Sequence, residues 1–529
     1  MFKGFQKDGK PFFPVGAQTH NSSSYTEEDF RYAAQCTKNL CCNMIEAPVY
    51  WNKIEPEEGV FDFTSIDYMI RISREMDLKL IVLWFGSMKN GDMSYCPTFV
   101  KADTRRFPRA LRADGVMLQN LSSYSAANRV ADAAAYERFI GHVKNIDSLE
   151  QTVIAIQVEN EPGYLQSDRD YSPEAEAHLK RDIPAGLVDF LKARGCGFPY
   201  EQWIKHGTKQ AGAWEEVFGI HGIEFCEAYQ ISQAIDYIAE CGKKIYDIPM
   251  YVNVWLDTGE FAIPGIGCPG GGPLPRVLDI WKFKSPHIDF VAPDIYTRNY
   301  RSYRDMCDTY SRDDNPLFVP ESNGNGANAT HVFYAVGARN AIGFAVFGVE
   351  SLFDADGSIK PDSEAMRESN QFLLNAQSLL ARFRGTGRIY PVVQEADIPR
   401  ENYEFERFYG CVNFRPAGLP GLAGVGYKSW NSPAADTPLP ARGLIFEAGP
   451  TEFYLVGNFH LKFMYKSSPE RILAAQPYVV VGFASVEEGY FNDNDEFVVT
   501  GERNGDEVLH GDFCAMPCGG ITRVRLIGG

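Results

Sequence analysis

Short apolar runs alternate with amphipathic segments along the chain from about residue 10 to residue 385. Several of these runs are apolar at nearly every position, which is typical of strands that are covered on both faces. Helical patterns lie between many of the runs, for example at residues 26–40, 65–76 and 135–143. Eight strands alternating with helices predict a parallel α/β barrel, the (β/α)₈ or TIM-barrel fold. The eight runs occupy residues 12–18, 42–50, 78–85, 152–159, 248–255, 288–296, 316–320 and 342–348.

Two parts of the chain depart from this alternation. Residues 164–245 are too long for one loop and carry helical patterns near residues 173–194 and 225–241. We therefore expect an inserted helical region together with the fourth barrel helix. Beyond the barrel, alternating apolar and polar runs are separated by clusters of Asn, Asp and Gly, a pattern typical of antiparallel strands. The sequence predicts a barrel domain at residues 1–385 and a C-terminal antiparallel β-sandwich domain at residues 386–529.

The amino-acid composition excludes some classes of binding partner and says less about the fold. The 529 residues carry a net charge of −18, which argues against nucleic acid and anionic membranes as partners. No apolar run reaches the length of about 18 residues that a membrane-spanning helix needs. The chain begins without an apolar leader, and its 12 cysteines are scattered, so we expect a cytoplasmic protein with reduced thiols. The 9 histidines are also dispersed, and we predict no metal and no other cofactor.

Two glutamates stand where apolar runs end. Glu161 closes the run that begins at Thr152 and is followed by Pro162 and Gly163. Glu321 follows the run at residues 316–320 in the same way. In a barrel enzyme the C-terminal ends of the strands form the active face, and two facing carboxylates there are the minimal machinery for cleaving a glycosidic bond. The pair therefore predicts a glycosidase with a carbohydrate substrate.

Other motifs in the barrel strengthen this prediction. They resemble those of family 35 glycoside hydrolases, which are β-galactosidases in a clan of retaining (β/α)₈ glycosidases, and especially a bacterial subgroup with a short β-rich C-terminal domain. The resemblance spans residues 10–385 and, more loosely, the remainder of the chain. The residues that carry it are Tyr50-Trp51-Asn52, Glu55-Pro56, Gly59, Phe61-Asp62-Phe63, Trp84 to Ser87, Lys89-Asn90-Gly91, Ser94-Tyr95 and Ile156 to Glu161.

The sequence departs from the classical family at two places. Three residues before Trp51 the family has a tyrosine, whereas this chain has Pro48. After the third strand the family has a Cys-Ala-Glu-Trp segment that helps to hold galactose, and here the segment is Trp84-Phe85-Gly86-Ser87. Because both glutamates are in place, the reaction class is unaffected, but the identity of the sugar is left open.

The resemblance implies roles for particular residues. Glu321 is implied to be the nucleophile and Glu161 the acid/base of a double displacement. Asn160 is implied to bind the sugar 2-hydroxyl group, and Tyr296 to hydrogen-bond the nucleophile. The implied activity is that of a retaining, exo-acting β-galactosidase, which hydrolyses terminal β-D-galactosyl residues of oligosaccharides or glycosides.

Further polar and aromatic residues near strand ends are candidates for contacts with a sugar. Each has a structural interpretation beside the functional one, since a lone histidine is more often part of the scaffold and a tryptophan near a strand is often core. The remaining candidates for substrate binding are His20, Asn21, Trp84, Asn90, Tyr95 and Trp255. Among other carboxylates, we interpret Glu159 as support for Glu161, Glu46 as a buried pair or layer residue, and Glu350 as an alternative partner of Glu161.

Rival functions stay open from the sequence alone. A transglycosylase would use the same two glutamates and let a second sugar take the place of water. A β-glucosidase, or an enzyme for another β-glycoside, would share the barrel and differ in the glycone. A non-catalytic carbohydrate-binding protein predicts a broken glutamate pair, and a metal-dependent hydrolase predicts clustered His and Asp. A homo-oligomer is also compatible with the sequence. The C-terminal domain then either completes the active site of a neighbouring subunit or only covers barrel helices.

Overall fold

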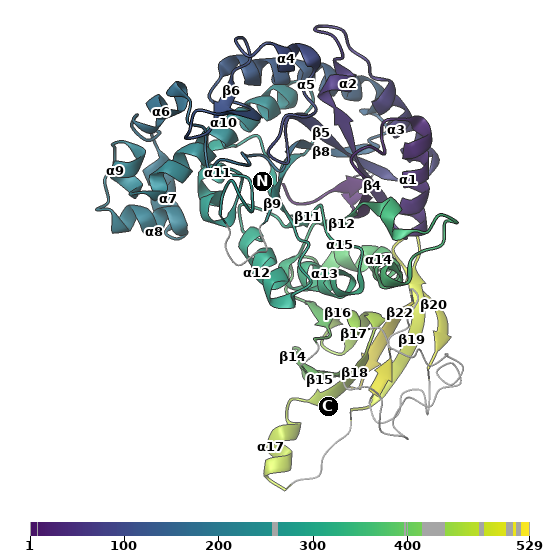
Figure 1. Cartoon of the computed structure of the whole chain (residues 1–529). Coiled ribbons are helices and arrows are strands. Elements are labelled where there is room, and N and C mark those ends of the chain that lie inside the picture. Colours follow the sequence, from purple (N-terminus) through teal and green to yellow (C-terminus); the bar gives the residue numbers. More distant parts are fainter. Residues whose placement is uncertain are drawn as a thin grey trace.

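Eight parallel strands form the barrel that the apolar runs predict (Figure 1). Hydrogen bonds join the strands in the order β10-β9-β8-β5-β4-β3-β12-β11. A bridge between Ile295 and Ser322, just beyond β10 and β11, brings the two end strands together, so the barrel is nearly closed. The strands are β3 (Val15–Gln18), β4 (Met44–Tyr50), β5 (Lys79–Lys89), β8 (Val153–Asn160), β9 (Met250–Trp255), β10 (Phe290–Asp294), β11 (Phe318–Val319) and β12 (Gly343–Phe347).

The fold is that of a computed structural model, which describes residues 2–7, 9–256, 263–395, 398, 400–414, 440–475, 481–503, 512–514 and 520–527. Within those residues, no helix combines the length and the apolar character that crossing a bilayer requires.

Helices cover the outside of the barrel in the predicted alternation. Thr26 caps the first of them by accepting the N–H of Asp29 at 3.2 Å, as the Thr-x-x-Asp pattern predicts. The helix predicted at residues 135–143 begins earlier, at Ala126, because its alanine-rich start favours helix without an amphipathic pattern. The barrel helices are α1 (Glu27–Asn39), α3 (Thr64–Glu75), α5 (Ala126–Asp147), α10 (His221–Ile245), α11 (Leu278–Lys284), α12 (Tyr300–Tyr310), α13 (Gly326–Arg339), α14 (Glu364–Asn375) and α15 (Gln377–Phe383).

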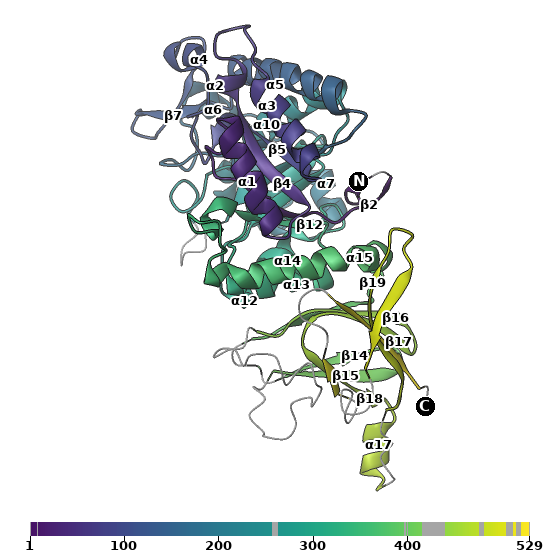
Figure 2. The same ribbon diagram turned by 90° about the vertical axis from the view of Figure 1, so that its right-hand side faces the viewer.

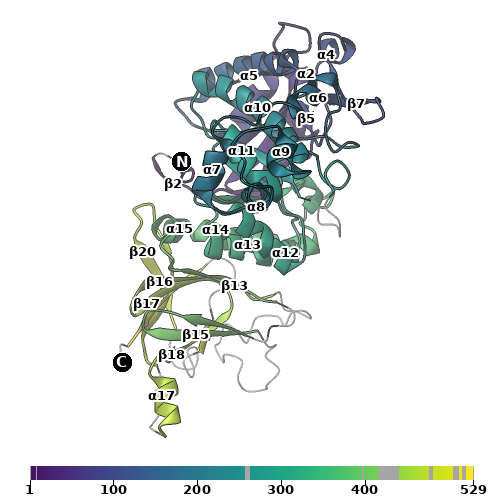
Figure 3. The same cartoon turned by 90° about the vertical axis from the view of Figure 1, so that its left-hand side faces the viewer.

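The predicted insertion lies between β8 and β9. Its helices α6 (Pro173–Leu179), α7 (Leu187–Arg194), α8 (Phe198–Lys205) and α9 (Trp214–Phe218) project from one side of the barrel (Figures 1 and 3). The pattern at residues 173–194 forms two helices, because Pro184 and Gly186, at φ 85°, interrupt it. Shorter elements are β1 (Gln6–Lys7), β2 (Lys10–Pro11), α2 (Trp51–Ile54), α4 (Thr98–Ala102), β6 (Arg109–Leu111), β7 (Met117–Leu121) and 3₁₀ turns at Pro275–Val277, Val349–Leu352 and Pro361–Ser363.

The C-terminal part forms two antiparallel sheets that pack face to face (Figure 2). Side chains from both sheets, such as Phe408 and Phe453, share one core, so the predicted β-sandwich is confirmed. One of the alternating apolar runs, at residues 478–483, lies partly outside the described residues. One sheet contains β13 (Ile389–Val393), β16 (Arg442–Gly449), β17 (Glu452–Asn458), β22 (Ile521–Leu526), β19 (Phe483–Phe491) and β20 (Phe497–Glu502). The other contains β14 (Arg400–Glu404), β15 (Phe408–Asn413), β18 (His460–Tyr465) and β21 (Asp512–Cys514), and α17 (Ser468–Leu473) follows β18.

The larger sheet also packs against the barrel. Helices α13 to α15 lie over its outer face (Figures 2 and 3). Leu444 and Phe446 of β16 belong to the same hydrophobic core as side chains of these helices, on the outside of the barrel. Arg442 is fully buried at this contact, where it donates to Ser369 Oγ at 2.8 Å and to Glu368 at 2.6 Å. The predicted division at residue 385 falls between α15 and β13.

Candidate active site

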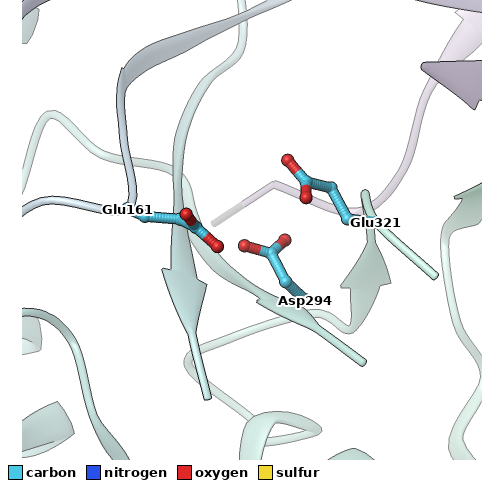
Figure 4. A group of neighbouring side chains, drawn as sticks. All are labelled: Glu161, Asp294 and Glu321. Atoms are coloured by element: carbon cyan, nitrogen blue, oxygen red, sulfur yellow. The ribbon is translucent and has the colours of Figure 1, made fainter. Parts of the chain in front are cut away.

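Three carboxyl groups meet at the C-terminal ends of the barrel strands (Figure 4). Glu161 follows β8, Asp294 ends β10, and Glu321 lies two residues beyond β11. The three residues are 7%, 3% and 5% exposed, and one oxygen from each lies within 4.8 Å of the others. Retaining glycosidases hold their two carboxyl groups about 5–5.5 Å apart, whereas inverting ones need about 6.5–9.5 Å. The spacing of Glu161 and Glu321 therefore fits the retaining geometry.

Both oxygens of Glu321 accept hydrogen bonds from residues at or just beyond the ends of other barrel strands. Gln18 Nε2, at the end of β3, donates to Oε1 at 2.9 Å. The Tyr296 hydroxyl, two residues beyond β10, donates to Oε2 at 2.6 Å. The two donors come from opposite sides and fix the carboxylate plane. The contact of Tyr296 with Glu321 is the one that the family resemblance implies.

The surroundings of Glu161 favour its protonated form. Its backbone is in the left-handed region at φ 45°, and its N–H donates to Asn253 Oδ1 at 2.7 Å, which holds the residue at the end of β8. Burial, followed by the negative charge of Glu321, raises the pKa of Glu161 to about 7, against the opposing effects of Lys89 and Asp294. A carboxyl group with a pKa near neutrality can serve as both acid and base.

Asp294 was not singled out from the sequence, although it lies in the predicted strand at residues 288–296. Asn253 Nδ2 donates to its Oδ2 at 2.9 Å, and its carboxyl group is in hydrogen-bonding contact with that of Glu161. Burial, then the charges of Glu321 and Glu161, raises the pKa of Asp294 well above its usual value. These surroundings favour the protonated form of Asp294 beside Glu161.

A chain of side chains connects Glu161 to the end of β5. Asn160 Nδ2 donates to Asn90 Oδ1 at 2.9 Å and lies 3.5 Å from Glu161 Oε2. Asn160 Oδ1 accepts from Gln157 Nε2 at 3.0 Å, which fixes the amide. Lys89 donates to the same oxygen of Asn90, and its positive charge lowers the pKa of Glu161. Asn160 and Asn90 thus lie at the site, and Lys89 is a further member, for which the sequence predicts no role.

His20 lies beside the site, in contact with the turn after β12. Its N–H donates to Glu350 Oε2 at 3.1 Å, and its Nε2 hydrogen-bonds Ser351 Oγ. Glu350 is therefore tied to the β3 end of the barrel, and it is not a member of the three-carboxylate cluster.

Asn21 and Tyr95 are both in contact with Tyr50. The Tyr50 hydroxyl donates to the Asn21 carbonyl oxygen at 2.5 Å, and the rings of Tyr50 and Tyr95 have centroids 5.1 Å apart. The buried Asn21 Oδ1 has no hydrogen-bond partner among the described residues. Contacts of Asn21, Tyr95 and His20 with a sugar stay predictions.

The prediction that Trp84 stacks on a sugar is wrong. Its side chain is fully buried and points outward from β5, where it stacks on Phe139 at 5.4 Å between centroids and donates to Asp132 at 2.9 Å. Trp84 therefore joins the barrel to α5. Trp255, at the end of β9, is partly exposed and stays a candidate for sugar stacking.

Glu159 also turns away from the three carboxyl groups. Its backbone adopts φ 62°, so the strand is irregular just before Glu161. Its carboxylate accepts the N–H of Met88 at 2.7 Å and that of Ser87 at 3.1 Å. Burial and the nearby Asp132 raise its pKa well above the usual value. Glu159 therefore supports the end of β5, which carries Lys89, and its predicted support of Glu161 stays a prediction.

The three-carboxylate cluster is the place where described residues could offer ligands to a cation. Hard cations such as Mg²⁺ and Ca²⁺ need about six to eight oxygen ligands. Both oxygens of Glu321 are engaged by donors, and one oxygen of Asp294 accepts from Asn253. The raised pKa values of Glu161 and Asp294 favour protonated carboxyl groups, which reduce the negative charge of the cluster. The carboxyl oxygens of the cluster are therefore better suited to sharing protons with one another than to binding a resident metal ion.

Comparison with protein families finds two matches along the chain. Residues 19–193 match the model of glycoside hydrolase family 42, described as "Beta-galactosidase". Residues 366–515 match a model described as "Domain of unknown function (DUF5597)". The predicted glycoside hydrolase resemblance is confirmed for the first region, which includes Glu161, but the matching family is 42 and not 35. No curated protein matches the chain.

Several solved structures are similar to the chain at low identity. The catalytic domain of β-amylase from Paenibacillus polymyxa is 12% identical, with 68% of this chain and 97% of that one covered and a TM-score of 0.48. A β-galactosidase from the haloarchaeon Halorubrum lacusprofundi is 16% identical, covering 69% and 58%, with a TM-score of 0.47. A β-galactosidase from Bacillus circulans sp. alkalophilus is 13% identical, covering 70% and 57%, with a TM-score of 0.48. The chain thus spans less than two thirds of the length of these two β-galactosidases.

Proposed function

We propose that this protein is a retaining, exo-acting β-glycosidase that removes terminal β-D-galactosyl residues from oligosaccharides or glycosides. The observation that carries the proposal is the pair Glu161 and Glu321, buried and close together at the C-terminal end of the barrel. The family match at residues 19–193 supports galactose as the glycone and exo action on it.

The first step forms a covalent intermediate. Glu321, oriented by Gln18 and Tyr296, attacks the anomeric carbon while the bond to the leaving oxygen breaks. Glu161 donates its proton to that oxygen, so the leaving group departs as a neutral alcohol. Asn160 lies beside Glu161 and is the side chain that we assign to the sugar 2-hydroxyl group, where a hydrogen bond strengthens in the transition state.

The second step depends on the loss of the negative charge of Glu321. Once Glu321 is an ester its negative charge is gone, and the charge that raised the pKa of Glu161 is removed. Glu161 then takes a proton from water, which attacks the anomeric carbon and releases Glu321. A protonated Asp294 beside it can stabilise ionised Glu161 at this stage by a hydrogen bond, with the proton staying on Asp294.

The pH dependence of the first step follows from Glu161. Because the active form has Glu161 protonated and Glu321 ionised, kcat/KM should have an acidic limb set by Glu321 and a plateau up to the Glu161 pKa of about 7, and it should fall about tenfold per pH unit above that value. Measurement of kcat/KM with a glycoside of poor leaving ability over the stable pH range tests this. An alkaline limb centred near the ordinary pKa of a glutamate would show that Glu161 is not the acid.

The glycone is tested with a panel of aryl glycosides. We expect aryl release from β-galactoside to exceed release from β-glucoside, β-xyloside, β-mannoside and α-arabinoside, because residues 19–193 match a β-galactosidase family. Products are identified at the same time, since free sugar marks hydrolysis and a disaccharide marks transfer. Faster release from another sugar would replace galactose in the proposal, and no release from any sugar at substrate saturation would contradict the proposed function.

A further inference from the structure

Glu46 is a buried acid beneath the candidate active site that the mechanism does not use. It lies in the middle of β4, between Met44 and Tyr50, which belong to the cluster that fills the barrel interior. Period-two alternation therefore directs Glu46 into the interior as well. Its side chain is fully buried, and the Tyr251 hydroxyl approaches its Oε2 at 3.4 Å.

Gln18 is the neighbour of Glu46 on the adjacent strand. The two residues are register partners in the parallel β3–β4 pair, so their side chains leave the sheet on the same face. Gln18 uses its Nε2 to donate to Glu321, which leaves its Oε1 as a buried acceptor. Among the described residues, neither Gln18 Oε1 nor Glu46 Oε1 has a hydrogen-bond partner.

One proton can satisfy two oxygens that lack hydrogen-bond partners on register-paired, buried side chains. Buried polar atoms are almost always paired, and an amide oxygen and a carboxylate oxygen cannot pair without a proton. The ionisable groups that face Glu46 are Tyr251 and Glu321, and no cation among the described residues offsets a charge on it. Burial, followed by the charge of Glu321, raises the pKa of Glu46 well above its usual value, so a proton is available.

We propose that Glu46 is a protonated positioning residue: its Oε1–H donates to Gln18 Oε1 and thereby holds the Gln18 amide with Nε2 directed at Glu321. The opposite amide orientation would place an oxygen against the Glu321 carboxylate. An ionised Glu46 would instead attract Nε2 and compete with Glu321 for it. A neutral Glu46 beneath Glu321 therefore keeps one of the two hydrogen-bond donors of Glu321 in place without adding a second negative charge beside it.

Two substitutions of Glu46 distinguish the positioning role from a purely structural one, in which the side chain only fills space inside the barrel. Glu46→Gln keeps a donor for Gln18 and an acceptor for Tyr251, so we expect kcat/KM and its acidic limb to stay unchanged. Glu46→Met keeps the volume and removes the donor. We expect kcat/KM to fall about 10- to 100-fold and the acidic limb, set by ionisation of Glu321, to move up by about one pH unit.

Gln18→Met should reproduce the effect of Glu46→Met, and the double variant should be no worse than either single one, since both changes break one chain of hydrogen bonds. Met44→Leu, on the same strand and face, is the matched control and should leave the acidic limb unchanged. A folded Glu46→Met with an unmoved acidic limb would overturn the proposal, as would an equal shift in Glu46→Gln.

A spectroscopic measurement tests the proton itself and needs no activity. The infrared difference spectrum between the unsubstituted protein and Glu46→Gln at neutral pH should show loss of a carboxylic-acid C=O band. Loss of a carboxylate band instead would overturn the proposal. The kinetic readout rests on the proposed function, whereas this spectrum does not. An inactive protein with the carboxylic-acid band would therefore refute the glycosidase and retain protonated Glu46.

Discussion

Glu321→Gln should lose about 10⁴- to 10⁶-fold in kcat on an aryl β-galactoside while still binding the sugar. The amide has the shape of the carboxylate and can still accept from Tyr296 or Gln18, so the pocket keeps its geometry. It cannot form the glycosyl ester, because an amide is not a nucleophile at the anomeric carbon. Steady-state kinetics measure the loss, and calorimetric titration with galactose measures the retained binding.

Glu447→Gln is the matched control for this change. Glu447 is similarly buried, at 4% exposed, and accepts from the Tyr390 hydroxyl at 2.9 Å in the C-terminal sheet. Its substitution should leave kcat unchanged. A 2-fluoro galactosyl fluoride, which slows the second step, should label the unsubstituted protein on the peptide that contains Glu321. Labelling elsewhere, or residual activity of Glu321→Gln above a few per cent, would remove Glu321 from the nucleophile role.

The barrel could be predicted because its strands are apolar on both faces. Runs such as residues 78–85 and 342–348 need no tertiary information to be identified, and each corresponds to a strand. Glu161 and Glu321 could be predicted because each ends such a run, and the strand ends of a barrel converge. The β-sandwich was equally visible in the alternation beyond the barrel.

The remainder of the site depends on spatial proximity that sequence spacing does not encode. Asp294 is one acid at one strand end, and only the closing of β10 onto β11 places it between the two glutamates. Lys89 matters because β5 runs on for several residues past the predicted end at Phe85. Asn253 is a mid-strand residue whose importance appears only through its contacts with Glu161 and Asp294.

The error at Trp84 has a different origin. Its neighbours Leu83 and Phe85 face the barrel interior, so alternation alone directs Trp84 outward. The sequence contains that signal, and alternation determines the direction of a strand side chain more directly than proximity to a strand end does. Glu159 is the opposite case, because its left-handed backbone breaks the alternation and no pattern in the run shows this.

Glu161→Ala should reduce kcat/KM about 10²- to 10⁴-fold on substrates with poor leaving groups and much less on activated aryl glycosides, which need no proton. The alkaline limb near pH 7 should vanish, because the group that titrates there is gone. Azide should restore turnover on an activated substrate, since the space left by the side chain admits an anion that attacks the glycosyl ester in place of activated water. The product should be a β-glycosyl azide, because two inversions retain the configuration.

Glu350→Ala is the control for this change, at the carboxylate that the sequence leaves open as a partner of Glu161 in place of Glu321. Glu350 accepts the N–H of His20 and lies outside the carboxylate cluster, so its loss should leave the alkaline limb in place and should not be rescued by azide. Rescue of Glu350→Ala, with none for Glu161→Ala, would exchange their roles. An α-azide from Glu161→Ala would require a single displacement and would contradict the retaining mechanism. The stereochemistry of one product therefore tests both the identity of the acid/base and the covalent role of Glu321.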